Sequence, residues 1–310
     1  KDRMAEEGME GTVRVYGCPA EEIVVGKIRM NEQGVFDDLS AAVTWHPFDR
    51  NRVSYDIWQA QDIKNYKFFG KAAHASKHPE MGRSALDAAE LMNVGVNYLR
   101  EHVADDVRMH YTYINTDGPA NVVPPYAATN YFVRSGKWER TLDASERVDN
   151  CARGAALMTG TRVEIERVTC NKEMKPNRTL AEVLYEEMQK VPVPEYTEEE
   201  IKFAEKIAEN AGLGGKAPEE LFTGLEPLES EPVPLAIGTD VSDVSHTVPT
   251  VMLSAACMCK GTPLHHWAAT AQAGMSIGQK GMAYAAECMA AGAYRLMTEP
   301  ALLEKVWEEM

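Results

Sequence analysis

The chain has 310 residues, of which 45% are hydrophobic and 25% are charged, a globular balance that excludes a disordered or collagen-like chain. Its 47 acidic and 32 basic residues give a net charge of −15, which excludes general nucleic-acid binding because phosphate contacts need clustered Lys and Arg. The same charge argues against an anionic membrane surface as partner, and no apolar run approaches the roughly 20 residues of a membrane-spanning helix.

The first part of the chain, residues 1–62, contains one helix end and two strands. Residues 1–7 predict the last turns of a helix that stops at Gly8, because glycine is common directly after a helix. Alternating apolar residues predict strands over 12–16 and 41–45. No capping residue precedes the opening helix, so we expect that the N-terminal segment of a longer protein is missing from this sequence.

The middle part, residues 63–172, has its own pattern of predicted strands and helices. Alternating segments predict strands, and segments with helical spacing predict helices. In chain order these are a strand at 64–69, a helix at 83–102, strands at 108–115 and 127–133, a helix at 142–159 and a strand at 161–168. This β-α-β-β-α-β order is that of the ferredoxin-like motif, so we expect a compact inserted α+β domain.

The last part, residues 173–310, contains mainly helices. Apolar spacing predicts helices at 180–189, 198–210 and 271–297, and a strand at 251–256. Six sparse cysteines form no regular framework, which favours free thiols in a reducing cytoplasm. Cys257 and Cys259, beside the predicted strand, are more typical of buried packing than of a metal site.

Residues that could carry chemistry lie near the ends of predicted strands. Glu21 and Glu22 follow the first strand, where one carboxylate could bind a metal and its neighbour could take a proton from water. The same pair could instead complement the dipole at the start of a helix. The other three places are histidine motifs, each of which also fits an ordinary surface, core or loop histidine: Trp45-His46-Pro47, His265-His266-Trp267 and Gly70-Lys-Ala-Ala-His74.

In their order along the chain, these motifs resemble the two-zinc aminoacylase and carboxypeptidase family of peptidases and amidohydrolases. The motifs are Gly-x-Pro-Ala-Glu-Glu at 17–22, the strand-end histidine, Gly-x-Ala-Ala-His-Ala at 70–75 and Thr-Pro-x-His at 262–265. Segments 34–47 and 239–250 extend the likeness over essentially the whole chain. The resemblance implies an α/β fold. Its zinc-peptidase-like three-layer catalytic domain, incomplete here, would comprise residues 1–62 and 173–310, and residues 63–172 would form an inserted ferredoxin-like lid and dimerisation domain.

The resemblance also implies a metal-dependent amidohydrolase that cleaves N-acyl amino acids, with p-aminobenzoyl-glutamate among the candidate substrates. Glu21 is the expected general base, and Glu22, His46 and His265 are expected ligands of two zinc or manganese ions. Zn²⁺ accepts carboxylate and imidazole, and catalytic sites keep a position open for water. The residues expected to orient these ligands are Asp240, Asp243 and His266.

Three further site residues come from the middle part. The resemblance implies that His74 reaches the active site of a partner subunit and stabilises the tetrahedral oxyanion there. It implies that Asn121 contacts substrate. It also implies that Arg134 holds a substrate carboxylate, although an ordinary surface arginine fits the same position. We therefore expect a homodimer formed through the lid domain, with a second, different subunit as the alternative partner.

One feature differs from the family pattern. The family carries further metal ligands on a histidine-containing segment before the Glu-Glu motif, and no His or Cys precedes Gly17 here. We therefore expect this chain alone to hold metal weakly or not at all, and to be inactive by itself. Two other functions stay open: a catalytically inactive binding or dimerisation subunit, and a general dipeptidase of the same family.

Overall fold

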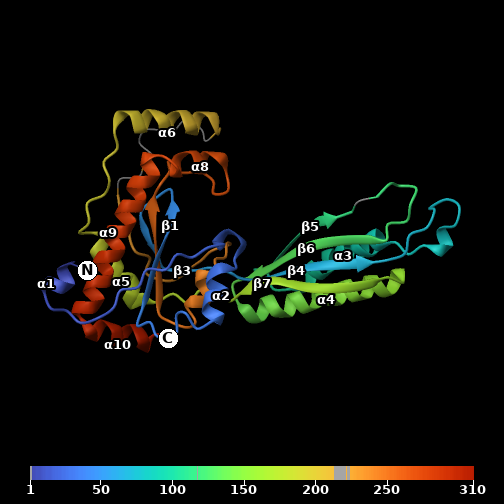
Figure 1. Cartoon of the computed structure of the whole chain (residues 1–310), viewed down its shortest axis with the longest axis horizontal. Coiled ribbons are helices and arrows are strands. Elements are labelled where there is room, and N and C mark those ends of the chain that lie inside the picture. The colour runs from blue at the N-terminus through green and yellow to red at the C-terminus, as the bar shows by residue number, and fades with distance from the viewer. Residues whose placement is uncertain (1, 117, 213–220, 222–223) are drawn as a thin grey trace.

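The computed structural model describes residues 2–116, 118–212, 221 and 224–310. Figure 1 shows two bodies along the long axis of the molecule. The main body holds both termini and a three-stranded sheet, and the sheet body, residues 60–171, is a four-stranded sheet with two long helices. Within the described residues, no helix is long and apolar enough to cross a membrane.

In the sheet body, strands and helices come in the predicted order. They are β4 (Ala60–Phe69), η2 (Pro79–Met81), α3 (Ala85–Leu99), η3 (Arg100–His102), β5 (Arg108–Asn115), β6 (Tyr126–Ser135), α4 (Trp138–Thr159) and β7 (Arg162–Asn171). The sheet is antiparallel in the order β5-β6-β4-β7. Alanine-rich faces of α3 and α4 pack on Tyr66, Phe68 and Tyr131 in a buried core. The role of this body as a lid stays a prediction.

The main body is built around a sheet in the order β1-β9-β2. The central strand β9 (Thr250–Ala256) is parallel to β1 (Ala42–Phe48) and antiparallel to β2 (Arg52–Ser54). Every residue of β9 is buried, as expected for a strand covered on both faces. Its odd-numbered residues face α5 (Arg178–Met188) and α9 (Ser276–Thr298), and Met252 faces Trp58 and Val241 on the other side.

The other elements of the main body are short strands and helices around this sheet. They are α1 (Asp2–Glu6), η1 (Glu21–Ile23), α2 (Gly26–Glu32), β3 (Asp56–Ile57), α6 (Glu198–Asn210), β8 (Val233–Pro234), α7 (Val241–Val244), α8 (Trp267–Ala273) and α10 (Pro300–Glu308). Local sequence sets several helix starts. Thr197 and Glu200 form a capping box at α6, and the Asn177 side chain accepts a hydrogen bond from the backbone of α5.

The predicted strand over 12–16 is wrong. No strand in the described part of the chain pairs with this segment. Val13 and Val15 are exposed, and the Arg14 guanidinium donates to the Asp38 carboxylate at 2.6 Å. Alternation alone therefore produced a strand pattern where side chains, and not a neighbouring strand, hold the segment in place.

The predicted closing helix over 271–297 is also wrong in its extent. Two helices occupy this region, α8 and α9, and they are separated at Gly274 and Met275. The corner depends on glycine, because a Cβ at Gly278 would lie 2.1 Å from the carbonyl oxygen of Ala273. The apolar spacing continues through this corner and hides it from the sequence pattern.

The chain enters and leaves the sheet body at one place. Gln61 pairs with Asn171 across β4 and β7. The Asn171 amide donates to the Gln59 carbonyl at 3.1 Å, and the Met174 N–H donates to the Trp58 carbonyl at 3.0 Å. The two connections therefore run side by side, and their hydrogen bonds join the two bodies.

Candidate functional site

The loop that carries Glu21 and Glu22 is strained. Both residues lie in the one-turn helix η1, and no strand precedes it among residues 2–20, so the predicted strand-end position is wrong. Ala20 and Val24 flank η1 in the left-handed region, with φ of 59° and 53°. A β-branched residue rarely adopts this conformation, because its Cβ meets the backbone.

His265 is the third non-glycine residue with a positive φ in the described part of the chain, at 56°. Strained backbone persists only where the surrounding structure holds it, and it gathers at functional sites. Ala20 and His265 thus belong to the motifs that the sequence singled out, and Val24 lies two residues after one of them. This observation depends on backbone geometry and is independent of any resemblance.

Glu22 and His265 lie together. The Glu22 carboxylate is 3.6 Å from Nδ1 of His265, although the two residues are far apart in the sequence. Both side chains are open to solvent, 72% and 78% exposed. A carboxylate and an imidazole at this separation are donors that Zn²⁺ or Mn²⁺ accepts.

Glu21 has different surroundings from its neighbour. It is partly buried, and Oε1 accepts a hydrogen bond of 3.0 Å from the hydroxyl of Thr239. Thr239 is 1% exposed. The sequence pattern does not reveal this contact, because no spacing rule links residues that lie this far apart along the chain.

Asp240 does not contact a predicted ligand histidine. Its carboxylate accepts hydrogen bonds of 2.8 Å from both the backbone N–H and the ammonium of Lys27, at the start of α2. Both side chains are buried, and burial raises the pKa of Asp240 despite these bonds. In this structure Asp240 thus forms an ion pair that fixes α2, and its role in orienting a histidine stays a prediction.

Asp243 likewise makes no hydrogen bond to a predicted histidine among the described residues. Its Oδ2 is buried and has no hydrogen-bond partner in the described part of the chain. Burial raises the pKa of its carboxyl to about 6, with Glu32 and Asp240 adding to the shift and the backbone and charge of Lys172 opposing it. Its backbone carbonyl accepts from the Asn31 side chain.

The two other histidines of the predicted site make local contacts. His46 lies within β1, not after it, and its Nδ1 is 2.7 Å from the carbonyl oxygen of Pro47. The His266 ring accepts a hydrogen bond of 3.2 Å from the Ala268 N–H and so caps α8. Among the residues that the structure describes, no three His, Cys, Asp or Glu side chains converge as a metal site. Glu22 and His265 therefore supply two suitable metal donors, and two donors alone do not complete a metal site.

His74 and Asn121 lie together at the distal end of the sheet body. His74 forms a bridge with Val122, and the Ala75 N–H donates to the Asn121 carbonyl at 2.9 Å. The His74 ring accepts from the backbone N–H of Lys77 at 3.3 Å, as in the loop-capping interpretation. In Figure 1, β4 points away from the main body toward this end, so the pair is remote from η1 of the same chain.

Arg134 lies at the opposite end of the sheet, within β6 and not after it. It pairs with Gln61 on the face that α3 and α4 leave open. Its Nε is buried without a partner in the described residues, and burial lowers the pKa of its guanidinium. Gln61 packs closely on Gly238, where a Cβ would meet its Nε2 at 2.0 Å, and Gly238 precedes Thr239. Arg134 is thus close to the segment that contacts Glu21.

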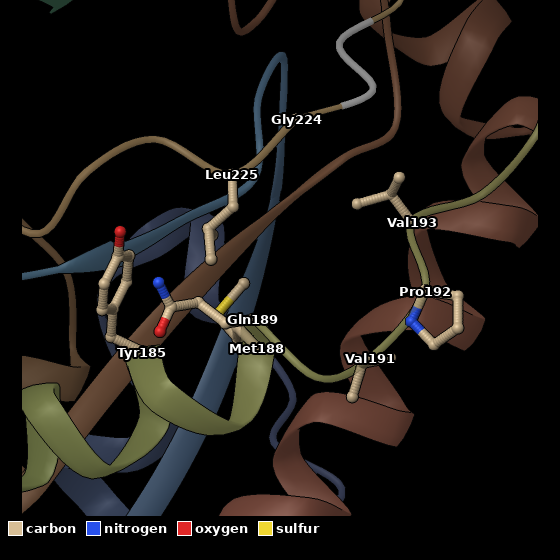
Figure 2. A pocket seen from close by; sticks show the side chains of 8 residues that line it. All are labelled: Tyr185, Met188, Gln189, Val191, Pro192, Val193, Gly224 and Leu225. Atoms are coloured by element: carbon tan, nitrogen blue, oxygen red, sulfur yellow. The ribbon is translucent and has the colours of Figure 1, made fainter.

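A hollow of about 500 Å³ lies elsewhere in the main body. It is formed by the end of α5 and the loops around Val193 and Leu225, and Figure 2 shows Leu225 pointing toward the end of α5. Its lining is mainly apolar, and it contains none of the predicted site residues. Among the described residues that line this hollow, only the phenol of Tyr185 could act as an acid or base, so the chemistry is better placed at η1.

Several known proteins are similar in sequence. The whole chain is 36% identical to a p-aminobenzoyl-glutamate hydrolase subunit of Escherichia coli and covers 69% of that protein. Over 66% of its residues it is 31% identical to the Xaa-Arg dipeptidase of Mus musculus, of which it covers 44%. No family model matches the chain.

Many solved structures share the fold. The aminobenzoyl-glutamate utilization protein from Klebsiella pneumoniae aligns with a TM-score of 0.66 at 21% identity, over 94% of this chain and 63% of that one. A dinuclear metal binding peptidase of Bacillus subtilis aligns with a TM-score of 0.54 at 18% identity, over 96% and 68%. The chain thus spans about two thirds of each of these structures.

Proposed function

Because the chain belongs to the peptidase and amidohydrolase family that includes p-aminobenzoyl-glutamate hydrolase, we propose that it hydrolyses the amide bond of N-acyl amino acids, aroyl-glutamates among them. The observation that carries the proposal is the strained loop at η1. It holds Glu21 and Glu22 in different surroundings and brings Glu22 to within 3.6 Å of His265. Function-bearing residues are commonly held in this way.

We assign the two glutamates separate roles. Glu21, partly buried and hydrogen-bonded through one oxygen, is the general base that takes a proton from water and returns it to the leaving amine. Glu22, His46 and His265 are the proposed donors for zinc or manganese, which supplies Lewis acidity when bound. Since only Glu22 and His265 lie together, a bound ion needs donors in addition to this pair.

We assign substrate recognition to the sheet body. Arg134 carries a buried donor, Nε, without a partner in the described residues. An unpartnered buried donor is more typical of an arginine that binds a substrate carboxylate than of an ordinary surface arginine. His74 and Asn121 lie at the far end of the sheet, so we propose that they serve the site of a second copy. The exposed apolar side chains of α3 and the edge strand β5 support a homodimer through this body. Six free cysteines support a cytoplasmic location.

Two other functions remain in competition with this proposal. The similarity to an Xaa-Arg dipeptidase supports a general dipeptidase. The incomplete ligand set supports a binding subunit that acts with a different, catalytic subunit. The intact Glu21–Glu22 pair favours an enzyme over a binding subunit.

A substrate panel tests the proposal. The protein, purified as its gene encodes it, is incubated with p-aminobenzoyl-glutamate, N-acetyl amino acids and Xaa-Arg dipeptides, and bound metal is measured in the same sample. We expect turnover of acylated amino acids that chelation abolishes and that zinc or manganese restores. Turnover of the dipeptides alone favours the dipeptidase. A metal-loaded sample that binds these compounds and cleaves none is a binding subunit.

A further inference from the structure

The Thr239 hydroxyl is held on both sides. Its Oγ1 accepts the Val241 N–H at 3.4 Å, and its own O–H donates to Glu21 Oε1 at 3.0 Å. A hydroxyl has only one proton to donate, and the backbone N–H already occupies an acceptor position. Because the Glu21 carboxylate can only accept, that proton goes to Glu21, and both contacts of the Thr239 hydroxyl are satisfied together. Because this residue is 1% exposed, water does not replace the bond easily.

The neighbours of this bond hold the same loop. Asp240, next to Thr239, binds the Lys27 backbone and ammonium at 2.8 Å and so ties the segment to α2 directly after the loop. The Thr169 hydroxyl, from β7, donates to the Val24 carbonyl at 2.6 Å. Thr239 is the member of this set that contacts the reacting carboxylate itself. The other two hold the backbone that carries it.

We propose that Thr239 is a positioning residue for Glu21: its hydroxyl fixes one carboxylate oxygen and leaves Oε2 aimed at water. This inference rests on the proposed function. A base that can rotate spends part of its time outside hydrogen-bond reach of the proton it must take, and small misplacements of catalytic groups lower rates steeply. Loss of the hydroxyl should therefore lower kcat, whereas substrate binding through Arg134 should be unaffected.

The test compares two variants and a control. Thr239→Val keeps the shape of the side chain and removes the donor, and Thr239→Ser keeps the donor. Thr250→Val is the matched control, because Thr250 is also buried in the main body and donates only to the Val248 carbonyl. We expect Thr239→Val to lower kcat about 10-fold or more with KM changed less than about 3-fold, and Thr239→Ser to restore most of the rate. Thr250→Val should keep the wild-type kcat.

A second measurement needs no activity. Amide hydrogen exchange over residues 20–25 should be faster in Thr239→Val than in wild type or Thr239→Ser, because one anchor of the strained loop is lost. Unchanged exchange in Thr239→Val overturns the proposal even if the wild-type protein hydrolyses nothing, in which case the proposed function fails separately. An active wild type whose kcat survives Thr239→Val, or drops equally in both variants, also overturns it.

Discussion

Glu21 and Glu22 are adjacent in the sequence but differ in exposure and partners. Glu21 is partly buried and bonded to Thr239, and Glu22 is 72% exposed beside His265. A base benefits from a fixed orientation, and a metal ligand must be open to the ion. The surroundings therefore divide the two carboxylates in the way that the proposed roles require.

Replacing each glutamate by glutamine should separate the roles. Glu21→Gln should leave the bound metal near the wild-type content while the rate falls by at least ~10², because the base is lost. Glu22→Gln should lower the metal content, since an amide is a weaker ligand than a carboxylate. Metal analysis and initial rates on the same preparations give the answer. If Glu21→Gln strips the metal and Glu22→Gln does not, the two roles are reversed.

Asp240 and Asp243 also differ in their partners, and this difference affects the stability of the fold. Asp240 is paired with Lys27, and the partly buried Asp243 has a buried oxygen that finds no hydrogen-bond partner among the described residues. The pKa of Asp243 is raised to about 6, so the folded state favours its protonated form. The stability that this group contributes is complete below its unfolded pKa, near ~3.9, and is lost as the pH rises through about 6.

Asparagine at these two positions should act in opposite directions. At pH 8, Asp243→Asn should raise the free energy of unfolding by roughly 1–3 kcal/mol, because it removes a buried charge. Asp240→Asn should lower it by roughly 3 kcal/mol, because Lys27 loses its partner. Urea unfolding from pH 4 to pH 8 measures both, and the gain for Asp243→Asn should vanish near pH 4. An equal gain at both pH values would rule out the titration of Asp243 as its cause.

At the scale of elements, η1 is a single helical turn, and its conformation depends on the residues at its two ends. Ala20 and Val24 adopt left-handed conformations that cost side chains energy, and the helix itself contributes one turn. The loop is therefore held by contacts to residues that lie far away in the sequence. Replacing a strained residue by glycine should show this directly.

Ala20→Gly should leave the free energy of unfolding unchanged or raise it by up to ~1 kcal/mol, because glycine adopts a positive φ without strain. The matched control is Ala286→Gly, at an exposed position inside α9, which should lose about 0.5–1 kcal/mol. Chemical unfolding of both variants against wild type gives the comparison. A loss of similar size in both variants would show that Ala20 is not strained.

The elements of the sheet body could be predicted from the sequence because each one carries its own periodicity. Strand β5 and helix α6 have the predicted limits, 108–115 and 198–210. Residues 12–16 show where this reasoning ends, because alternation does not reveal whether a neighbouring strand exists. Contacts such as that of Thr239 with Glu21 cannot be predicted from the sequence pattern either. They depend on how segments more than 200 residues apart pack, which no local pattern encodes.

On the scale of the whole molecule, the sheet body presents an uncovered apolar stripe. Leu91, Val94 and Tyr98 recur at helical spacing on the outer face of α3 and are 38%, 49% and 71% exposed. Tyr111 and Tyr113 of the edge strand β5 are also exposed, and Asn93 of α3 donates to the Tyr113 hydroxyl at 3.0 Å. Helix and strand thus present one continuous surface, on which we place the proposed dimer contact.

Charge on this stripe should break the dimer. The double variant Val94→Glu and Tyr98→Glu should convert a dimer to a monomer by light scattering, because a carboxylate would be buried at the contact. Met282→Glu is the control, since Met282 is an equally exposed apolar residue on α9 of the main body. A wild-type monomer at micromolar concentration, or a dimer that survives the double variant, would contradict the proposed contact.

The shared entry and exit of the sheet body bear on how such a protein can change during evolution. Gln61 and Asn171 are neighbours across two strands, so the backbone of the main body is almost continuous without the residues between them. Insertions whose ends meet are tolerated well, because the entropic cost of closing a loop grows only slowly with its length. Recombination can therefore exchange the sheet body as a unit without changing the path of the remaining backbone. Any replacement must still offer a hydrogen-bond donor to the Val24 carbonyl, where Thr169 now holds the loop that carries Glu21.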